Sequence, residues 1–61
     1  MRGTEEYITV FQGTAEIGAG EEVHRLNAGD SIRFPADQPH RYANAGEEPV
    51  QLSMLIYYDP V

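Results

Sequence analysis

The chain contains no cysteine, so no disulfide can staple its fold, and it offers no cluster of ligands for a structural metal. A cysteine-free sequence fits a reducing compartment, and we expect the protein to be cytoplasmic. Lysine is absent as well, and the four basic residues are arginines scattered singly, against ten acidic residues. Because phosphate binding needs clustered Lys and Arg, the net charge of −6 argues against a nucleic-acid surface.

Long hydrophobic runs are also missing. The longest apolar stretch, residues 54–58, falls far short of the roughly 20 residues that a membrane-spanning helix requires, so we expect no membrane partner. No nucleophile has an adjacent base, no glycine loop has phosphate-binding spacing, and no carboxylates form a close pair. These absences leave catalysis without support from the residues themselves.

The short length limits the core. Sixty-one residues allow one domain, 1–61, and at this size folding buries only about 60% of the surface of the unfolded chain. A single core below ~70 residues rarely contributes more than roughly 3–5 kcal/mol. Association with a second copy is the stabiliser that remains, and we expect an obligate homodimer.

Alternating polar and apolar residues dominate what is present. Turn signals recur about every 8–12 residues and no segment has a helical period, which predicts an all-β fold. The expected strands are residues 5–12, 15–17, 22–26, 31–34, 40–44 and 50–58. The expected core residues are Ile8, Val10, Ile17, Leu26, Ile32, Phe34, Leu52, Met54 and Ile56.

Residues 29–44 combine a turn, a strand, two prolines and a histidine. Pro35 ends the first strand by removing a hydrogen-bond donor, and Pro39 stiffens the approach to His40. His40 and Tyr42 then share one face of the next strand because side chains alternate. The pattern aims His40 inward from the mouth of a hairpin. His24 has no such context, and we expect it on the surface.

The spacing of Gly29, Pro35, His40 and Asn44 resembles the second motif of the cupin family, and Glu6 with Gly13 resembles the second half of the first motif. The sequence departs from the family at Asp37, where glycine is usual; because aspartate can also occupy turn conformations with positive φ, we expect the loop to be kept. Nearly the whole chain is similar to the small sensor domains that follow a helix-turn-helix in bacterial regulators. No DNA-binding helices accompany it here.

The resemblance implies an antiparallel β-barrel or jelly roll. Small cupin barrels begin with one or two further strands and a His-x-His pair before the motif glutamate, and neither precedes Glu6. The barrel is therefore expected to be incomplete within one chain and completed by dimerisation. Apolar surface on Tyr7, Phe11, Leu55 and Tyr57 would then be covered by pairing residues 5–12 or 50–58 across subunits.

Four residues are the predicted ligand-binding set: Glu6, His40, Tyr42 and Met54. Glu6 and His40 are also the only candidates for a metal, and two protein ligands are too few for a tight site, so we predict no cofactor beyond a weak or adventitious divalent ion. The leading hypothesis is a non-catalytic, dimeric module that binds a small molecule. The alternatives are a metal-dependent cupin isomerase or dioxygenase, or a truncated remnant of a longer protein.

Overall fold

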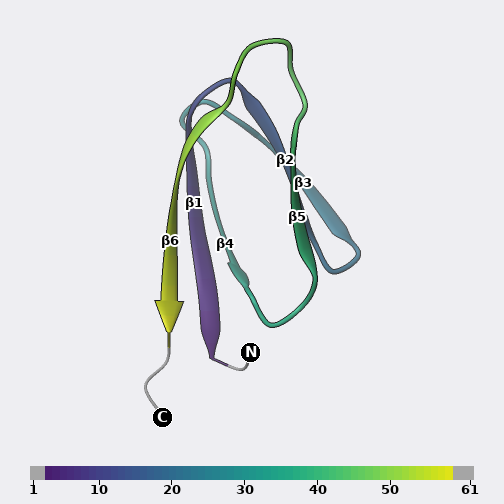
Figure 1. Ribbon diagram of the computed structural model, residues 1–61, viewed down its shortest axis with the longest axis vertical. Helices are drawn as coiled ribbons and strands as arrows, with labels where there is room; N and C mark the ends of the chain where they lie inside the picture. The colour runs from purple at the N-terminus through teal and green to yellow at the C-terminus, as the bar shows by residue number, and fades with distance from the viewer. Residues whose placement is uncertain (1–2, 59–61) are drawn as a thin grey trace.

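Six β-strands and no helix make up residues 3–58, the part of the chain that the computed structural model describes (Figure 1). The strands are β1 Thr4–Gln12, β2 Thr14–Ala19, β3 Glu22–Asn27, β4 Ser31–Pro35, β5 His40–Asn44 and β6 Gln51–Tyr58. The all-β prediction is confirmed, and each expected strand is present with ends that differ by a few residues at most. None of the described residues forms a helix that could cross a membrane.

The strands form two antiparallel sheets of three, in the orders β4-β1-β6 and β3-β2-β5. Figure 1 shows the two sheets facing each other, with β1 and β2 joined at one end of the molecule. The arrangement is a fragment of a jelly roll. Because β1 has a partner on each side, it has no free edge, and the expectation that residues 5–12 could pair across subunits is wrong.

The core lies between the sheets and is supplied mainly by the two central strands. Its buried hydrophobic residues are Ile8, Val10, Ala15, Ile17, Ala19, Leu26 and Phe34, with Ile32, Val50 and Leu52 partly buried against them. Met54 and Ile56 were expected in this core but are 43% and 42% exposed. They lie opposite Ile8 and Glu6 in register, so they share the inner face. They are exposed because β6 is an edge strand, and no other strand among residues 3–58 covers this part of its inner face.

Glycines with positive φ allow two of the turns. Gly13, between β1 and β2, has a φ of 82°, and a Cβ there would lie 2.8 Å from the backbone oxygen of Pro49. Gly29, before β4, has a φ of 96° and nothing within 4 Å of the Cβ position. Asp37 does not use the positive φ that aspartate can adopt, since no described residue other than glycine has one. The loop between β4 and β5 closes with ordinary backbone geometry.

Candidate functional site

A carboxylate sits in the space between the two sheets. Glu6 occupies an inward position of β1, between the inward residues Thr4 and Ile8, and is only 4% exposed. An ionised carboxylate in such surroundings is costly unless hydrogen-bond donors satisfy its oxygens. The donors therefore define the site.

Both donors come from β5 in the opposite sheet. Tyr42 and His40 pair in register with the buried Ile17 and Ala19, so their side chains point toward the same interior space as Glu6. The Tyr42 hydroxyl donates to Oε1 of Glu6, and Nε2 of His40 lies 3.2 Å from Oε2. One carboxylate thereby bridges the two sheets.

His40 is held on both ring nitrogens. Its Nδ1 lies 3.1 Å from the carbonyl oxygen of Gln38. Its ring is tilted against that of Phe34, with centroids 5.9 Å apart, and meets that of Tyr42 edge-on, with centroids 5.8 Å apart. A carbonyl oxygen and an ionised carboxylate both only accept hydrogen bonds. The doubly protonated imidazolium is therefore the form of His40 that donates to both partners, and in that form it makes an ion pair with Glu6.

Tyr42 is held as a neutral donor. Partial burial of the ring raises the pKa of its hydroxyl well above the usual value, and the hydrogen bond to Glu6 and the negative charge of that carboxylate raise it further. The hydroxyl therefore keeps its proton at neutral pH and above. This makes Tyr42 a permanent donor to Glu6 and excludes it as a general base at neutral pH.

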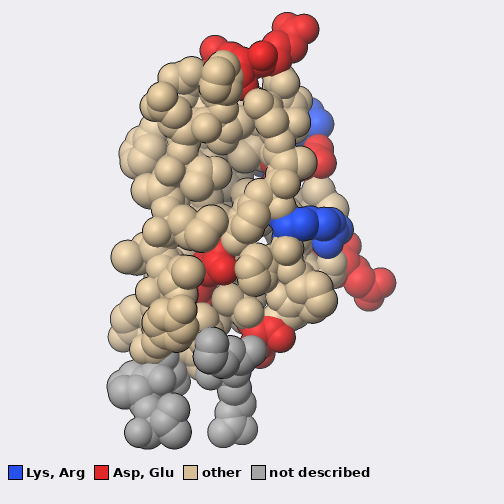
Figure 2. All heavy atoms as spheres, viewed as in Figure 1, with Lys and Arg blue, Asp and Glu red and all other residues tan. Residues whose placement is uncertain are grey.

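Beside this polar trio lies an open, mostly apolar hollow with a volume of ≈ 200 Å³. Its lining residues are Ala15, Tyr42, Ala43, Asn44, Val50 and Leu52. On the face shown in Figure 2 the surface is hollowed between β6 and β5. Tyr42 belongs both to the trio and to the hollow, so a ligand in the hollow would meet polar groups at one side.

Asn44, the last residue of β5, shapes the loop at the edge of the hollow. Its Nδ2 donates to the carbonyl oxygen of Glu48 at 3.0 Å, and its Oδ1 accepts from the backbone N–H of Gly46 at 2.9 Å. Both side-chain groups are thus used within residues 44–48. The asparagine at this motif position fixes the turn that leads into β6.

The structure brings three of the four predicted ligand-binding residues together: Glu6, His40 and Tyr42. Met54 lies on the inner face of β6 opposite Ile8, outside both the hydrogen-bonded trio and the lining of the hollow. His24, expected at the surface, is half-buried on the edge strand β3, with Nε2 3.0 Å from Oε1 of Glu22. The sequence reasoning did not predict that Ala15, Val50 and Leu52 line the hollow. Their inward positions in the alternation of polar and apolar residues could have indicated it.

A metal ion would find few ligands here. Among residues 3–58, no three His, Cys, Asp or Glu side chains gather closely enough to hold one. Glu6 and His40 supply two donor atoms, whereas catalytic zinc sites use three protein ligands. These two side chains already contact each other, so the donor set does not fit a tightly held catalytic metal.

Comparison with known proteins gives one family and two relatives. Residues 2–57 match the family model described as Cupin domain. The HTH-type transcriptional regulator SutR of Escherichia coli strain K12 is 37% identical over 57 residues, which are 93% of this chain and 32% of that protein. The polyketide synthase CurC of Streptomyces cyaneus is 29% identical over 58 residues, 95% of this chain and 36% of that protein. The chain thus spans about a third of the length of these relatives, and no solved structure matches it.

Proposed function

The chain belongs to the cupin family, and from that premise we propose that it is a non-catalytic module that binds a small molecule between its two sheets. The observation that carries the proposal is the bridge from Glu6 to Tyr42 and His40 beside an apolar hollow. The similarity to a helix-turn-helix regulator supports a sensor-type role for this part. We place the module in the cytoplasm.

The chemistry of the trio suggests which ligands fit. A carboxylate offers about four lone-pair sites, and Glu6 uses one on each oxygen for Tyr42 and His40. The carboxylate therefore keeps acceptor capacity for a hydroxyl or ammonium group. The hollow is smaller than the ~300–1,000 Å³ typical of drug-sized sites, so the ligand is a small apolar body with one hydrogen-bond donor.

Three probes of similar shape test this proposal: cyclohexylamine, cyclohexanol and cyclohexanecarboxylate. We expect the amine to bind most tightly and the carboxylate least, because Glu6 attracts a donor and repels an anion. Calorimetry and thermal shift should show that Glu6→Gln weakens amine binding at least tenfold, whereas His24→Ala, which removes a side chain paired with Glu22 and not with Glu6, leaves it unchanged. Equal binding of all three probes, or equal effects of the two substitutions on amine binding, would refute the proposed ligand site at Glu6.

A metal-dependent cupin enzyme is the second candidate, and the 3.2 Å approach of His40 to Glu6 is the observation that favours it. Two ligands from neighbouring sheets could form part of a larger set. Metal analysis of protein purified without chelators separates the candidates. A stoichiometric transition metal would support the enzyme, and less than a tenth of an equivalent would support the binding module.

We further propose that the module is an obligate homodimer. The buried core of the described residues has seven hydrophobic residues, two of which are alanines. Tyr7, Phe11, Leu55 and Tyr57 remain exposed, as the sequence predicted. Folding and association would then be one event, so the thermal midpoint should rise with protein concentration. A folded monomer at low micromolar concentration, seen by sedimentation, would contradict this.

A further inference from the structure

A second cleft, with a volume of ≈ 140 Å³, lies on the outer face of the β3-β2-β5 sheet. Its lining residues are Glu16, Gly18, Val23, Arg41, Tyr42 and Ala43. We propose that this cleft binds a small aliphatic carboxylate through the guanidinium of Arg41. Side chains alternate along β5, so Arg41 and Ala43 point outward while His40 and Tyr42 point between the sheets. The cleft is therefore separate from the site at Glu6, and this inference does not rest on the function proposed above.

Gly18 makes room for the side chain of Arg41. A Cβ at position 18 would lie 2.6 Å from Cζ and 2.8 Å from Cγ and Nε of Arg41, so the arginine lies across β2 directly over this glycine. Gly18 is buried although it faces outward, and it does not have the positive φ that would call for glycine. Glycine inside a strand weakens the strand and often marks a place that another group approaches closely. The space at position 18 thus sets where the guanidinium lies.

Arg41 has hydrogen-bond donors left for a ligand. Its Nη1 donates to the carbonyl oxygen of Gly20 at 3.3 Å, whereas a guanidinium carries five N–H donors. Each of the other two arginines among residues 3–58 lies within 3.2 Å of a glutamate oxygen, in the pairs Arg25–Glu16 and Arg33–Glu5. Within that part of the chain Arg41 has no such ion pair. A planar carboxylate suits it because a guanidinium can donate two parallel hydrogen bonds to the two carboxylate oxygens.

The remaining walls favour a short aliphatic body. Val23 lies opposite Gly18 in register and is 56% exposed, and Ala43 adds a methyl group. Glu16 is the acidic lining residue, but its Oε2 lies 3.2 Å from Nη2 of Arg25, which offsets its charge. The cleft is smaller than the ~300–1,000 Å³ of drug-sized sites, so the acid must be small.

The overall charge opposes an anion only weakly at this place. The net charge is −6, but charges more than about 8 Å away are largely screened at physiological salt. Figure 2 shows arginine atoms on the side of the molecule where β2, β3 and β5 run in Figure 1, and many of the acidic atoms at the ends. The local charge at the cleft is therefore the one that an anion meets.

Isobutyrate and isobutyramide are matched probes, since they share a shape and differ in charge. We expect isobutyrate to cause saturable shifts of the Gly18 and Val23 amide signals and of the Arg41 Nε–H signal in heteronuclear NMR at constant ionic strength. It should bind about tenfold more tightly than isobutyramide, because charge-assisted bidentate hydrogen bonds are stronger than neutral ones. Equal affinities for the two probes would overturn the proposal.

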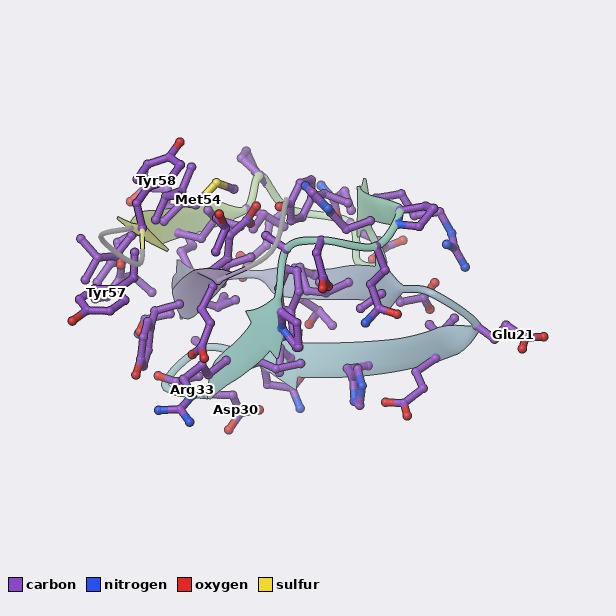
Figure 3. The ribbon with its side chains drawn as sticks, turned by 90° about the horizontal axis from the view of Figure 1, so that it is seen from below. Glu21, Asp30, Arg33, Met54, Tyr57 and Tyr58 are labelled. Carbon is purple, nitrogen blue, oxygen red and sulfur yellow. The ribbon has the colours of Figure 1, made fainter. Side chains whose placement is uncertain are left out.

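Arg41→Gln should abolish the saturable shifts of the Gly18 and Val23 amides. The matched control is Arg33→Gln, which removes the same charge from another exposed arginine. Figure 3 shows Arg33 well apart from Glu21, which follows Gly20 in the β2–β3 hairpin. We expect the control to bind isobutyrate like the wild-type protein. Equal losses in the two variants would show that only net charge matters, and would refute the cleft.

Two further variants test the position and shape of the guanidinium. Gly18→Ala puts a methyl group where the guanidinium lies, and Arg41→Lys keeps the charge but loses the planar fork; each should weaken isobutyrate binding about fivefold. Circular dichroism checks that each variant is folded, and Arg41→Lys carries the test if Gly18→Ala is not. Unchanged affinity in the folded variants would contradict the proposal. Glu6→Gln should leave isobutyrate binding intact, and a loss there would assign the acid to the space between the sheets instead.

Discussion

Removing one hydroxyl tests whether the bridge between the sheets stabilises the fold. In Tyr42→Phe the ring stays, but Oε1 of the buried Glu6 loses its donor. A hydrogen bond to a charged group contributes about 1.5–3 kcal/mol to stability. Because Tyr42 is 41% exposed, water partly replaces the lost donor, and we take the lower end, about 1.5 kcal/mol. For a domain of this size that free energy corresponds to a fall in the thermal midpoint of about 6–12 °C.

The matched control is Tyr7→Phe, since Tyr7 is 39% exposed and its hydroxyl also has one protein partner, Nη1 of Arg33 at 2.8 Å. That contact is on the outer surface, where the loss should stay within about 0.5 kcal/mol. Urea or thermal unfolding followed by circular dichroism, at equal protein concentrations, measures both changes. A cost for Tyr42→Phe no larger than that for Tyr7→Phe would show that the bridge does not stabilise the fold.

The same variant makes a prediction about alkaline pH. The folded state raises the pKa of Tyr42, mainly through burial and then through Glu6, so the unfolded chain loses this proton first as pH rises. The stability that Tyr42 contributes is therefore fully present below its unfolded pKa of about 10, and it declines as pH rises through the higher folded pKa. The difference in stability between the wild-type protein and Tyr42→Phe should shrink above pH ~10. A difference that stays constant to pH ~12 would contradict the raised pKa.

Two further substitutions have defined outcomes. Gly13→Ala should lower the free energy of unfolding by more than ~1 kcal/mol, because alanine is strained at a φ of 82° and its methyl group would lie 2.8 Å from a backbone oxygen. In the same urea titration the control Gly46→Ala should cost less, because its Cβ would meet no atom closer than 3.6 Å. His40→Ala should weaken cyclohexylamine binding in calorimetry more than His24→Ala does, because of the two histidines only His40 contacts the Glu6 carboxylate. Equal losses of affinity would refute the assignment of His40 to the site.

The convergence of Glu6, His40 and Tyr42 could be predicted because it depends on local rules. Side chains alternate along a strand, so inward places follow from the neighbouring apolar residues, and the motif spacing indicated which two strands face each other. The exposure of Met54 and Ile56 could not be predicted in this way. Their alternation matches a core strand, but their burial depends on whether another strand covers β6, which is a property of the sheet order.

The turn chemistry was predicted less well than the strands. Gly13 and Gly29 take the positive φ that glycine at a motif turn indicates. At Asp37 the loop is kept as expected, but without a positive φ, because the turn from β4 to β5 spreads the change of direction over several residues with ordinary φ. A substitution at one motif position therefore says little about the conformation of a loop whose neighbours can adjust.

The register of β1 and β6 places Glu6 directly opposite Ile56. Side chains opposite each other in an antiparallel pair have Cβ atoms about 4.5–5.5 Å apart, so the carboxylate of the site is adjacent to the exposed apolar side chains of β6. A movement of β1 on ligand binding would therefore reach β6 through the ladder of backbone hydrogen bonds. Thermodynamic linkage is reciprocal: a ligand that strengthens association must itself bind the associated form more tightly. The apparent affinity for cyclohexylamine would then depend on protein concentration, and a titration repeated at several dilutions would measure that coupling.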